Sequence, residues 1–369
     1  MSDEVTAEFQ AFLDERLPAF KQKWGDTTNW DARCAWQRIL NEDRWAAPLW
    51  PTEYGGRGLL PHEAFRVVEL LTEAGFGLLP GVVGLNYIGP TIFNWGTQEQ
   101  KEQHLSKILD ASEIWCQGFS EPEAGSDLAS LRTSAVRAGD KFVINGQKIW
   151  TSNAMGATHM ELLVRTDPSA PKHHGISALI VDMSSSGIER RPIKQIDGGD
   201  SFAEVFFTDV EVPVVNLLGS ENQGWRVTMS TLGYERAGAA SMTRRLAVET
   251  AALIQHQHVR DLSPEARSEL LRRYIEVKVI EALGEQTLAR VAEGHEPGAE
   301  LSIVKLMYTE ACQRIGALRL AFAGKDGISG RDPEAVHSYL NARSLTIAGG
   351  TTQVMKNIMA ERVLGLPRD

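Results

Sequence analysis

The spacing of apolar residues changes twice along the chain, and this change restricts the folds that the chain can adopt. Up to about residue 112 the apolar positions recur at helical spacing, as Phe9, Phe12 and Leu13 do. From about 113 to 222, short β-rich runs with a period of two replace them, separated by Gly, Pro and Asp. Helical spacing returns at Trp225. The sequence therefore predicts a mainly α protein with a central antiparallel β-domain. The expected domains are an N-terminal helical domain (1–112), a central β-domain (113–222) and a C-terminal helical domain (223–369).

Composition excludes several classes of protein. The 369 residues exceed one ordinary domain, and 43% hydrophobic content is enough for a sizeable core. A net charge of −10 argues against a nucleic-acid-binding protein, which would show a basic patch. The three cysteines show no metal-binding spacing, so we expect no metal site and a reduced, intracellular protein. The first residues lack the features of a signal peptide, and no stretch is apolar enough to span a bilayer. We therefore expect a cytoplasmic protein.

A turn-rich stretch, residues 115–127, follows the first helical region. It contains Ser120, the fixed φ of Pro122, and Gly125 beside Ser126. Glycine lets a backbone approach a ligand closely, and hydroxyl and N–H groups suit a polar, partly anionic ligand. A loop between domains has the same composition for purely local reasons. On its own, this stretch does not decide between the two.

A second stretch, residues 141–152, predicts a β-hairpin and places an aromatic residue beside two hydroxyls. Asn145-Gly146 between two apolar runs is the strongest short-range signal for a type I′ turn. The second arm would end at Trp150, followed by Thr151 and Ser152. A tryptophan in this position is either a buried anchor or a wall for a planar cofactor.

In this order and spacing, the two stretches resemble the flavin-contacting motifs of the acyl-CoA dehydrogenase family. The resemblance extends to the runs 50–58, 96–101 and 349–353 and so covers nearly the whole chain. It implies the family's helical, β, helical order of domains and the cofactor FAD. It also implies oxidation of a CoA thioester across its α and β carbons, in which a carboxylate takes the α proton and flavin N5 accepts the β hydrogen.

The resemblance also implies the residues that would contact FAD. One set would line the pyrimidine side of the flavin, another the diphosphate, and a third the ring system near N5. A last pair would come from the loop near the C-terminus, although a Gly-Thr helix cap is the alternative interpretation of that loop. In this order the residues are Gln117, Phe119 and Ser120; Gly125 and Ser126; Trp150 and Ser152; and Thr351 and Gln353.

The chain departs from the commonest family pattern at the catalytic base. Gly349 stands where most members carry a glutamate, whereas some branches carry the base in a Glu-Arg pair on the helix after the β-domain. This chain has Glu235-Arg236 at that point, among small residues that would leave room for a bulky acyl group. A Glu-Arg pair on a helix is usually a solvated surface. The matching position, together with the empty loop position, predicts that Glu235 is the base. Arg236 would then be a positioning cation, and the Gly349 N–H would donate to the thioester oxygen.

A second departure concerns assembly. The family motifs by which one subunit clasps its neighbour's flavin, Arg-x-x-Phe-Gly and Gln-x-x-Gly-Gly, are missing. In this respect the chain resembles bacterial members acting on steroid-derived or other bulky acyl-CoAs, some of which are heteromers. We expect a homodimer, tetramer or heteromer that passes electrons to an electron-transfer flavoprotein. An oxygen-using oxidase or monooxygenase on the same fold remains an alternative. So does a non-catalytic partner subunit, against which Glu235 argues.

Overall fold

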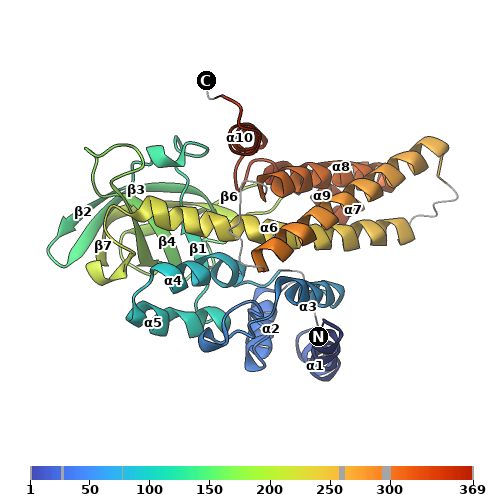
Figure 1. Cartoon of the computed structure of the whole chain (residues 1–369), viewed down its shortest axis with the longest axis horizontal. Coiled ribbons are helices and arrows are strands. Elements are labelled where there is room, and N and C mark those ends of the chain that lie inside the picture. Colours follow the sequence, from blue (N-terminus) through green and yellow to red (C-terminus); the bar gives the residue numbers. More distant parts are fainter. Residues whose placement is uncertain (1, 26–28, 77, 257–261, 293–300, 368–369) are drawn as a thin grey trace. The chain divides into compact units, whose positions relative to one another are not determined.

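The computed structural model describes residues 2–25, 29–76, 78–256, 262–292 and 301–367. The chain forms two compact units, and each is interrupted in sequence. The first, here called the β unit, comprises Glu8–Leu59 and Leu78–Tyr234. The second, here called the helical unit, comprises Met1–Ala7, Leu60–Gly77 and Glu235–Asp369. The predicted order of helical, β and helical segments along the chain is confirmed (Figure 1).

The β unit is built around one eight-stranded sheet with the order β6-β7-β3-β2-β4-β5-β8, in which β1 pairs with β4. The strands are β1 (Trp115–Gly118), β2 (Ser134–Ala138), β3 (Lys141–Ser152), β4 (His159–Arg165), β5 (Ile176–Asp182), β6 (Ile188–Ile193), β7 (Phe202–Pro213) and β8 (Leu217–Leu218).

The prediction of a purely antiparallel domain is wrong, because β4 runs parallel to both β1 and β2. Parallel neighbours require a long connection between them. The β2–β3 hairpin lies between β1 and β4 in the sequence and supplies part of that connection. Local turn signals report only on adjacent strands, so they did not reveal this pairing.

The hairpin turn predicted at Asn145-Gly146 is also wrong. Strand β3 continues through both residues, and the turn of the β2–β3 hairpin is at Gly139-Asp140. At Gly146 the strand carries an irregularity against β7, and a Cβ there would lie within 2.8 Å of Thr133. Asn145 exchanges two hydrogen bonds with Asp209 of β7, both of 2.9 Å. The Asn-Gly pair therefore allows close approach between chain segments rather than a reversal of direction.

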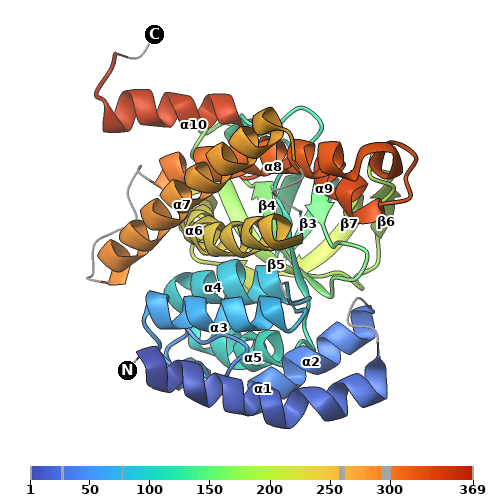
Figure 2. The same cartoon turned by 90° about the vertical axis from the view of Figure 1, so that its right-hand side faces the viewer.

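Helices cover the sheet of the β unit and complete its core. They are most of α1 (Ser2–Trp24), then α2 (Trp30–Glu42), α4 (Gly89–Trp95), α5 (Gln98–Leu109) and the beginning of α6 (Gly224–His256). Helices α2, α4 and α5 lie next to one another (Figure 2). One sheet face carries an apolar cluster that includes Phe142, Ile144 and Leu162.

The helical unit contains α3 (Pro61–Glu73), the rest of α6, α7 (Pro264–Ala292), α8 (Leu301–Ile328), α9 (Pro333–Leu345) and α10 (Thr352–Ile358). Its core includes Leu246, Val277 and Ala311 from α6, α7 and α8. Arg244 of α6 forms ion pairs with Glu69 of α3 and Glu281 of α7, which ties these helices together. Among the helices that the structure describes, none is long and apolar enough to cross a bilayer.

Candidate functional site

The two stretches singled out in the sequence lie side by side in the β unit. The Ile149 N–H donates to the Ser120 carbonyl at 2.9 Å. The ammonium of Lys148 donates to the Phe119 carbonyl at 3.0 Å and to Glu121 at 2.8 Å. The loop that follows β1 is therefore fastened to strand β3 at the residues that the resemblance implies as flavin contacts.

Sequence reasoning missed the importance of the Lys148–Glu121 pair. Lys148 is fully buried, and burial lowers its pKa to about 8 although Glu121 opposes the shift. Burial by itself would raise the pKa of Glu121, but Lys148 and the N–H groups of Arg132 and Thr133 bring it below its usual value. A signal was present, because the period of two puts Lys148 on the same strand face as the buried Phe142 and Ile144.

Trp150 is held in an exposed, strained position. Its φ is +60°, and the pairing of β3 with β7 is irregular between Lys148 and Thr151. Both of those neighbours are buried, whereas Trp150 is 55% exposed. A bulky residue with positive φ costs roughly 1–3 kcal/mol and is found mostly at functional sites. Of the two interpretations left open, a buried anchor is therefore excluded.

The remaining predicted flavin contacts of the β unit differ in their exposure. Gly125, Ser126 and Ser152 are exposed, and a Cβ on Gly125 would meet nothing within 4 Å. Gln117 and Ser120 are half-buried, and the Phe119 side chain is buried. The amide nitrogen of Gln117 has no hydrogen-bond partner among the described residues. An exposed indole, accessible hydroxyls and an unsatisfied amide donor form a set that fits an aromatic, phosphate-bearing cofactor.

Replacing Trp150 by Ala should weaken flavin retention roughly tenfold, because an aromatic contact contributes about 0.5–1.5 kcal/mol beyond area burial. Flavin content after purification and titration of the apoprotein with FAD measure this effect. Trp150→Phe is the control, since it keeps an aromatic wall and should retain most of the affinity. An alanine variant with unchanged flavin content and absorption spectrum would remove Trp150 from the cofactor site.

Glu161 is a buried carboxyl group on β4, next to Gln117 of β1 in the parallel register. Its Oε1 accepts a hydrogen bond of 2.9 Å from the Thr231 hydroxyl, and its Oε2 has no partner within the described part of the chain. Burial raises its pKa to about 8, a shift that the Thr231 hydrogen bond opposes. Glu161 is therefore a neutral acid in the folded protein at neutral pH.

This proton makes stability depend on pH. An unfolded glutamate loses its proton near pH 4.3, so the folded state binds more protons from there up to about pH 8. The free energy of unfolding should fall across that range by about 1.4 kcal/mol per pH unit on account of Glu161. Glu161→Gln should remove this slope in urea-unfolding series, whereas Gln in place of the exposed Glu53 should not. Parallel profiles for wild type and Glu161→Gln would show that the group does not hold a proton.

In the helical unit, Glu235 of α6 and Gly349 of the loop between α9 and α10 meet. Gly349 has φ +63°, and a Cβ built on it would lie 2.8 Å from Glu235 Oε1. The Glu235 carboxylate therefore occupies the space where a side chain on residue 349 would begin. The side chain of Arg236 lies outside the described residues.

Lys305 of α8 is a further member of this group that sequence reasoning missed. It is 5% exposed, and its ammonium donates to the carbonyls of Leu345, at 3.3 Å, and Gly350. Burial lowers the pKa of Lys305, and the negative charge of Glu235 opposes that shift. No local pattern points to this lysine, because its partners are 40 or more residues away along the chain.

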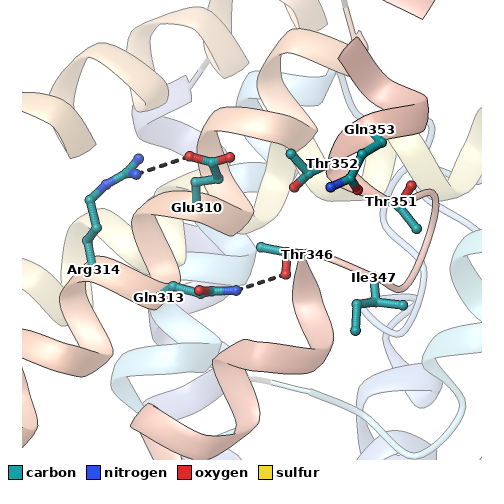
Figure 3. A pocket seen from close by; sticks show the side chains of 8 residues that line it. All are labelled: Glu310, Gln313, Arg314, Thr346, Ile347, Thr351, Thr352 and Gln353. Atoms are coloured by element: carbon teal, nitrogen blue, oxygen red, sulfur yellow. Dashed lines mark hydrogen bonds and ion pairs between the residues drawn. The ribbon is translucent and has the colours of Figure 1, made fainter. Parts of the chain in front are cut away.

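Thr351 and Gln353 line a pocket of about 440 Å³ within the helical unit (Figure 3). Thr351 also caps α10, since its hydroxyl oxygen accepts a hydrogen bond of 3.2 Å from the Val354 N–H. The alternative interpretation of this loop as a helix cap is therefore correct for Thr351, and it does not remove the residue from the pocket. The other lining residues are Glu310, Gln313, Arg314, Thr346, Ile347 and Thr352.

Among the described residues, His104, Glu113 and His159 have the spacing of metal ligands, with candidate atoms within 4.8 Å of one another. Glu113 Oε2 already bonds to His104 Nδ1 at 2.9 Å and to the Trp115 indole at 3.2 Å. Its Oε1 lies 3.4 Å from the ammonium of Lys107, which would repel a cation. We therefore interpret the cluster as a hydrogen-bonded part of the core rather than a metal centre.

Comparison with known proteins identifies the family. Sequence models of the acyl-CoA dehydrogenase N-terminal, middle and C-terminal domains match residues 2–112, 116–210 and 222–364. The chain therefore belongs to the acyl-CoA dehydrogenase family, whose members are oxidoreductases that use FAD. This confirms the resemblance, the three-domain architecture and the assignment as an enzyme.

The relatives are mainly mycobacterial and steroid-related. Acyl-CoA dehydrogenase IpdE1 of Mycobacterium tuberculosis is 35% identical over 376 residues, covering 100% of this chain and 96% of that protein. Acyl-CoA dehydrogenase FadE34 of the same organism is 41% identical over 323 residues, which are 87% of this chain but only 45% of FadE34. The solved Tcur3481-Tcur3483 steroid ACAD superposes with a TM-score of 0.86 at 31% identity, covering 100% of this chain and 98% of that one.

Proposed function

We propose that this chain dehydrogenates the α–β bond of a bulky, steroid-derived acyl-CoA thioester and that Glu235 removes the α proton. The observation that carries this proposal is the position of the Glu235 carboxylate, which lies against the backbone of Gly349. Most family members carry their base at the position of Gly349, so the two positions are suited to reach the same substrate atom. The steroid-related relatives support the class of acyl group.

The chain's own residues perform the proton transfer and stabilise the charge that it creates. Glu235 takes the α proton, and the negative charge that develops on the thioester oxygen needs preorganised donors. The N–H of Gly349 is such a donor. Arg236 stands beside the base in sequence and acts as a positioning cation for the substrate. Bound FAD supplies the redox step by accepting the β hydrogen as hydride.

The same residues that fit an aromatic, phosphate-bearing cofactor hold the FAD. Trp150 and Ser152 contact the ring system, and Gly125 and Ser126 the diphosphate. The other contacts are Gln117, Phe119 and Ser120 of the β unit and Thr351 and Gln353 of the helical unit.

The electron acceptor and the assembly follow from the family. We assign an electron-transfer flavoprotein as acceptor and a cytoplasmic location. The chain works in a homodimer, a tetramer or a heteromer, and the name of the Tcur3481-Tcur3483 steroid ACAD, which joins two polypeptides, supports the heteromer.

Turnover of a panel of CoA thioesters, with and without oxygen and with an artificial electron acceptor, tests the proposed function. We expect acceptor-dependent formation of an α,β-unsaturated thioester, greatest for ring-containing acyl groups. Rapid turnover with oxygen alone would instead indicate an oxidase or monooxygenase. A purified protein without flavin and without activity would indicate a partner subunit.

A further inference from the structure

A buried ammonium group stands beside the proposed base. Lys305 projects from α8 with 5% of its surface exposed, and its ammonium donates to the Leu345 carbonyl at 3.3 Å and to the Gly350 carbonyl. Leu345 is the last residue of α9, and Gly350 precedes Thr351, the N-cap of α10. One side chain thus fixes both ends of the loop that contains Gly349.

The lysine also borders the base itself. A Cβ on Gly349 would lie 2.8 Å from Glu235 Oε1 and 3.8 Å from Lys305 Cε, so both side chains surround the same point. Glu235 raises the pKa of Lys305 against the stronger lowering by burial, which shows that the two charges attract each other. This attraction is mutual, and it therefore also favours the ionised form of Glu235.

Burying an ammonium is costly unless hydrogen bonds and an opposite charge compensate for it. A methionine would fill the same space without that cost. Both compensating features are present here, and both lie at the proposed site. The loop also needs support of this kind, because Gly349 and Gly350 have φ values of +63° and +102° and glycine carries a large conformational entropy in the unfolded chain.

We propose that Lys305 is a positioning residue for the dehydrogenation: its ammonium keeps Glu235 ionised and holds the Gly349 N–H in place. This inference rests on the proposed role of Glu235. It adds to the site a third group that does not touch the reacting atoms.

The test is the pH dependence of flavin reduction in the holoenzyme, measured anaerobically with a CoA thioester that the wild type oxidises. Lys305→Met should slow reduction at least ~10-fold near neutral pH and move the midpoint of the rate–pH profile upward by about one unit or more. The rate should recover as the pH rises. Lys305→Arg, which keeps the charge, should leave the midpoint near that of the wild type. The matched control is Lys356→Met, on the exposed face of α10.

A merely structural lysine would give a different result, namely the same fractional loss of rate at every pH. That outcome, or an unchanged rate, would overturn the proposal. If Lys305→Met does not fold, Lys305→Gln carries the same prediction, because it keeps a hydrogen-bond donor and loses the charge.

A second readout needs neither cofactor nor turnover. Thermal unfolding midpoints of Lys305→Met, Glu235→Gln and the double variant form a double-mutant cycle. We expect Lys305→Met to lower the midpoint less in the Glu235→Gln background than in the wild type, since the attraction is already lost there. Additive effects would overturn the inference while leaving the proposed function intact. The proposed function fails separately, if Glu235→Gln reduces its flavin normally.

Discussion

Glu235→Gln should bind FAD and thioester as the wild type does and yet reduce its flavin at least ~10²-fold more slowly. Glutamine keeps the size and hydrogen-bonding capacity of the side chain while removing its basicity, and loss of a positioned base costs typically 10²–10⁴-fold. Anaerobic mixing with the thioester, followed at the flavin absorption band, measures the rate. Glu249→Gln is the matched control, because Glu249 lies on the same helix and pairs with Arg245 in a partly exposed position.

Near-normal reduction by Glu235→Gln would place the base elsewhere. A complementary variant, Glu235→Gly with Gly349→Glu, moves the carboxylate to the position used by most of the family. It should recover part of the lost rate, because Glu235 lies at the point where a side chain on 349 begins. Full recovery is not expected, since φ of +63° at residue 349 strains any residue with a Cβ.

Lys148→Met should destabilise the protein by about 3–5 kcal/mol and release the flavin, because it leaves the Glu121 carboxylate buried without its cation. The loop from Phe119 to Glu121 would lose two hydrogen bonds from the ammonium. Urea unfolding gives the stability, and flavin content after purification gives the retention. Adding Glu121→Gln should restore part of the stability, since the unpaired charge is then removed.

Lys141→Met is the control for this change. Lys141 lies on the same strand and pairs with Glu211, but both side chains are substantially exposed. An exposed pair contributes at most about 1 kcal/mol, so this variant should keep its stability and its flavin. Equal losses for the two lysine variants would show that the buried pair does not hold the loop.

The helical, β, helical order could be predicted from the sequence because it depends on apolar periodicity, which is a local property. The parallel pairing of β4 with β1 could not, since it joins segments about 40 residues apart. Asn145-Gly146 gave a wrong turn for a related reason. Its glycine is required by contact with Thr133, outside the strand, and not by the conformation of a turn.

The candidate site divides along the same line. Residues that belong to short motifs, such as Trp150 and Glu235, could be named in advance through the family resemblance. The two lysines that support them could not be found in that way, because their roles come from burial and from distant partners. Lys148 left a trace in the period of its strand, whereas Lys305 left none.

Exchange of α hydrogens with solvent tests the role of Glu235 most directly. A CoA thioester with sulfur in place of the β carbon has α hydrogens but cannot be dehydrogenated, so only the proton-transfer step is observed. In deuterated water, the wild-type holoenzyme should introduce deuterium at the α carbon, detectable by mass spectrometry. Glu235→Gln should do so at least ~10²-fold more slowly. Equal rates of deuterium incorporation by the two proteins would contradict the assignment of Glu235 as the base.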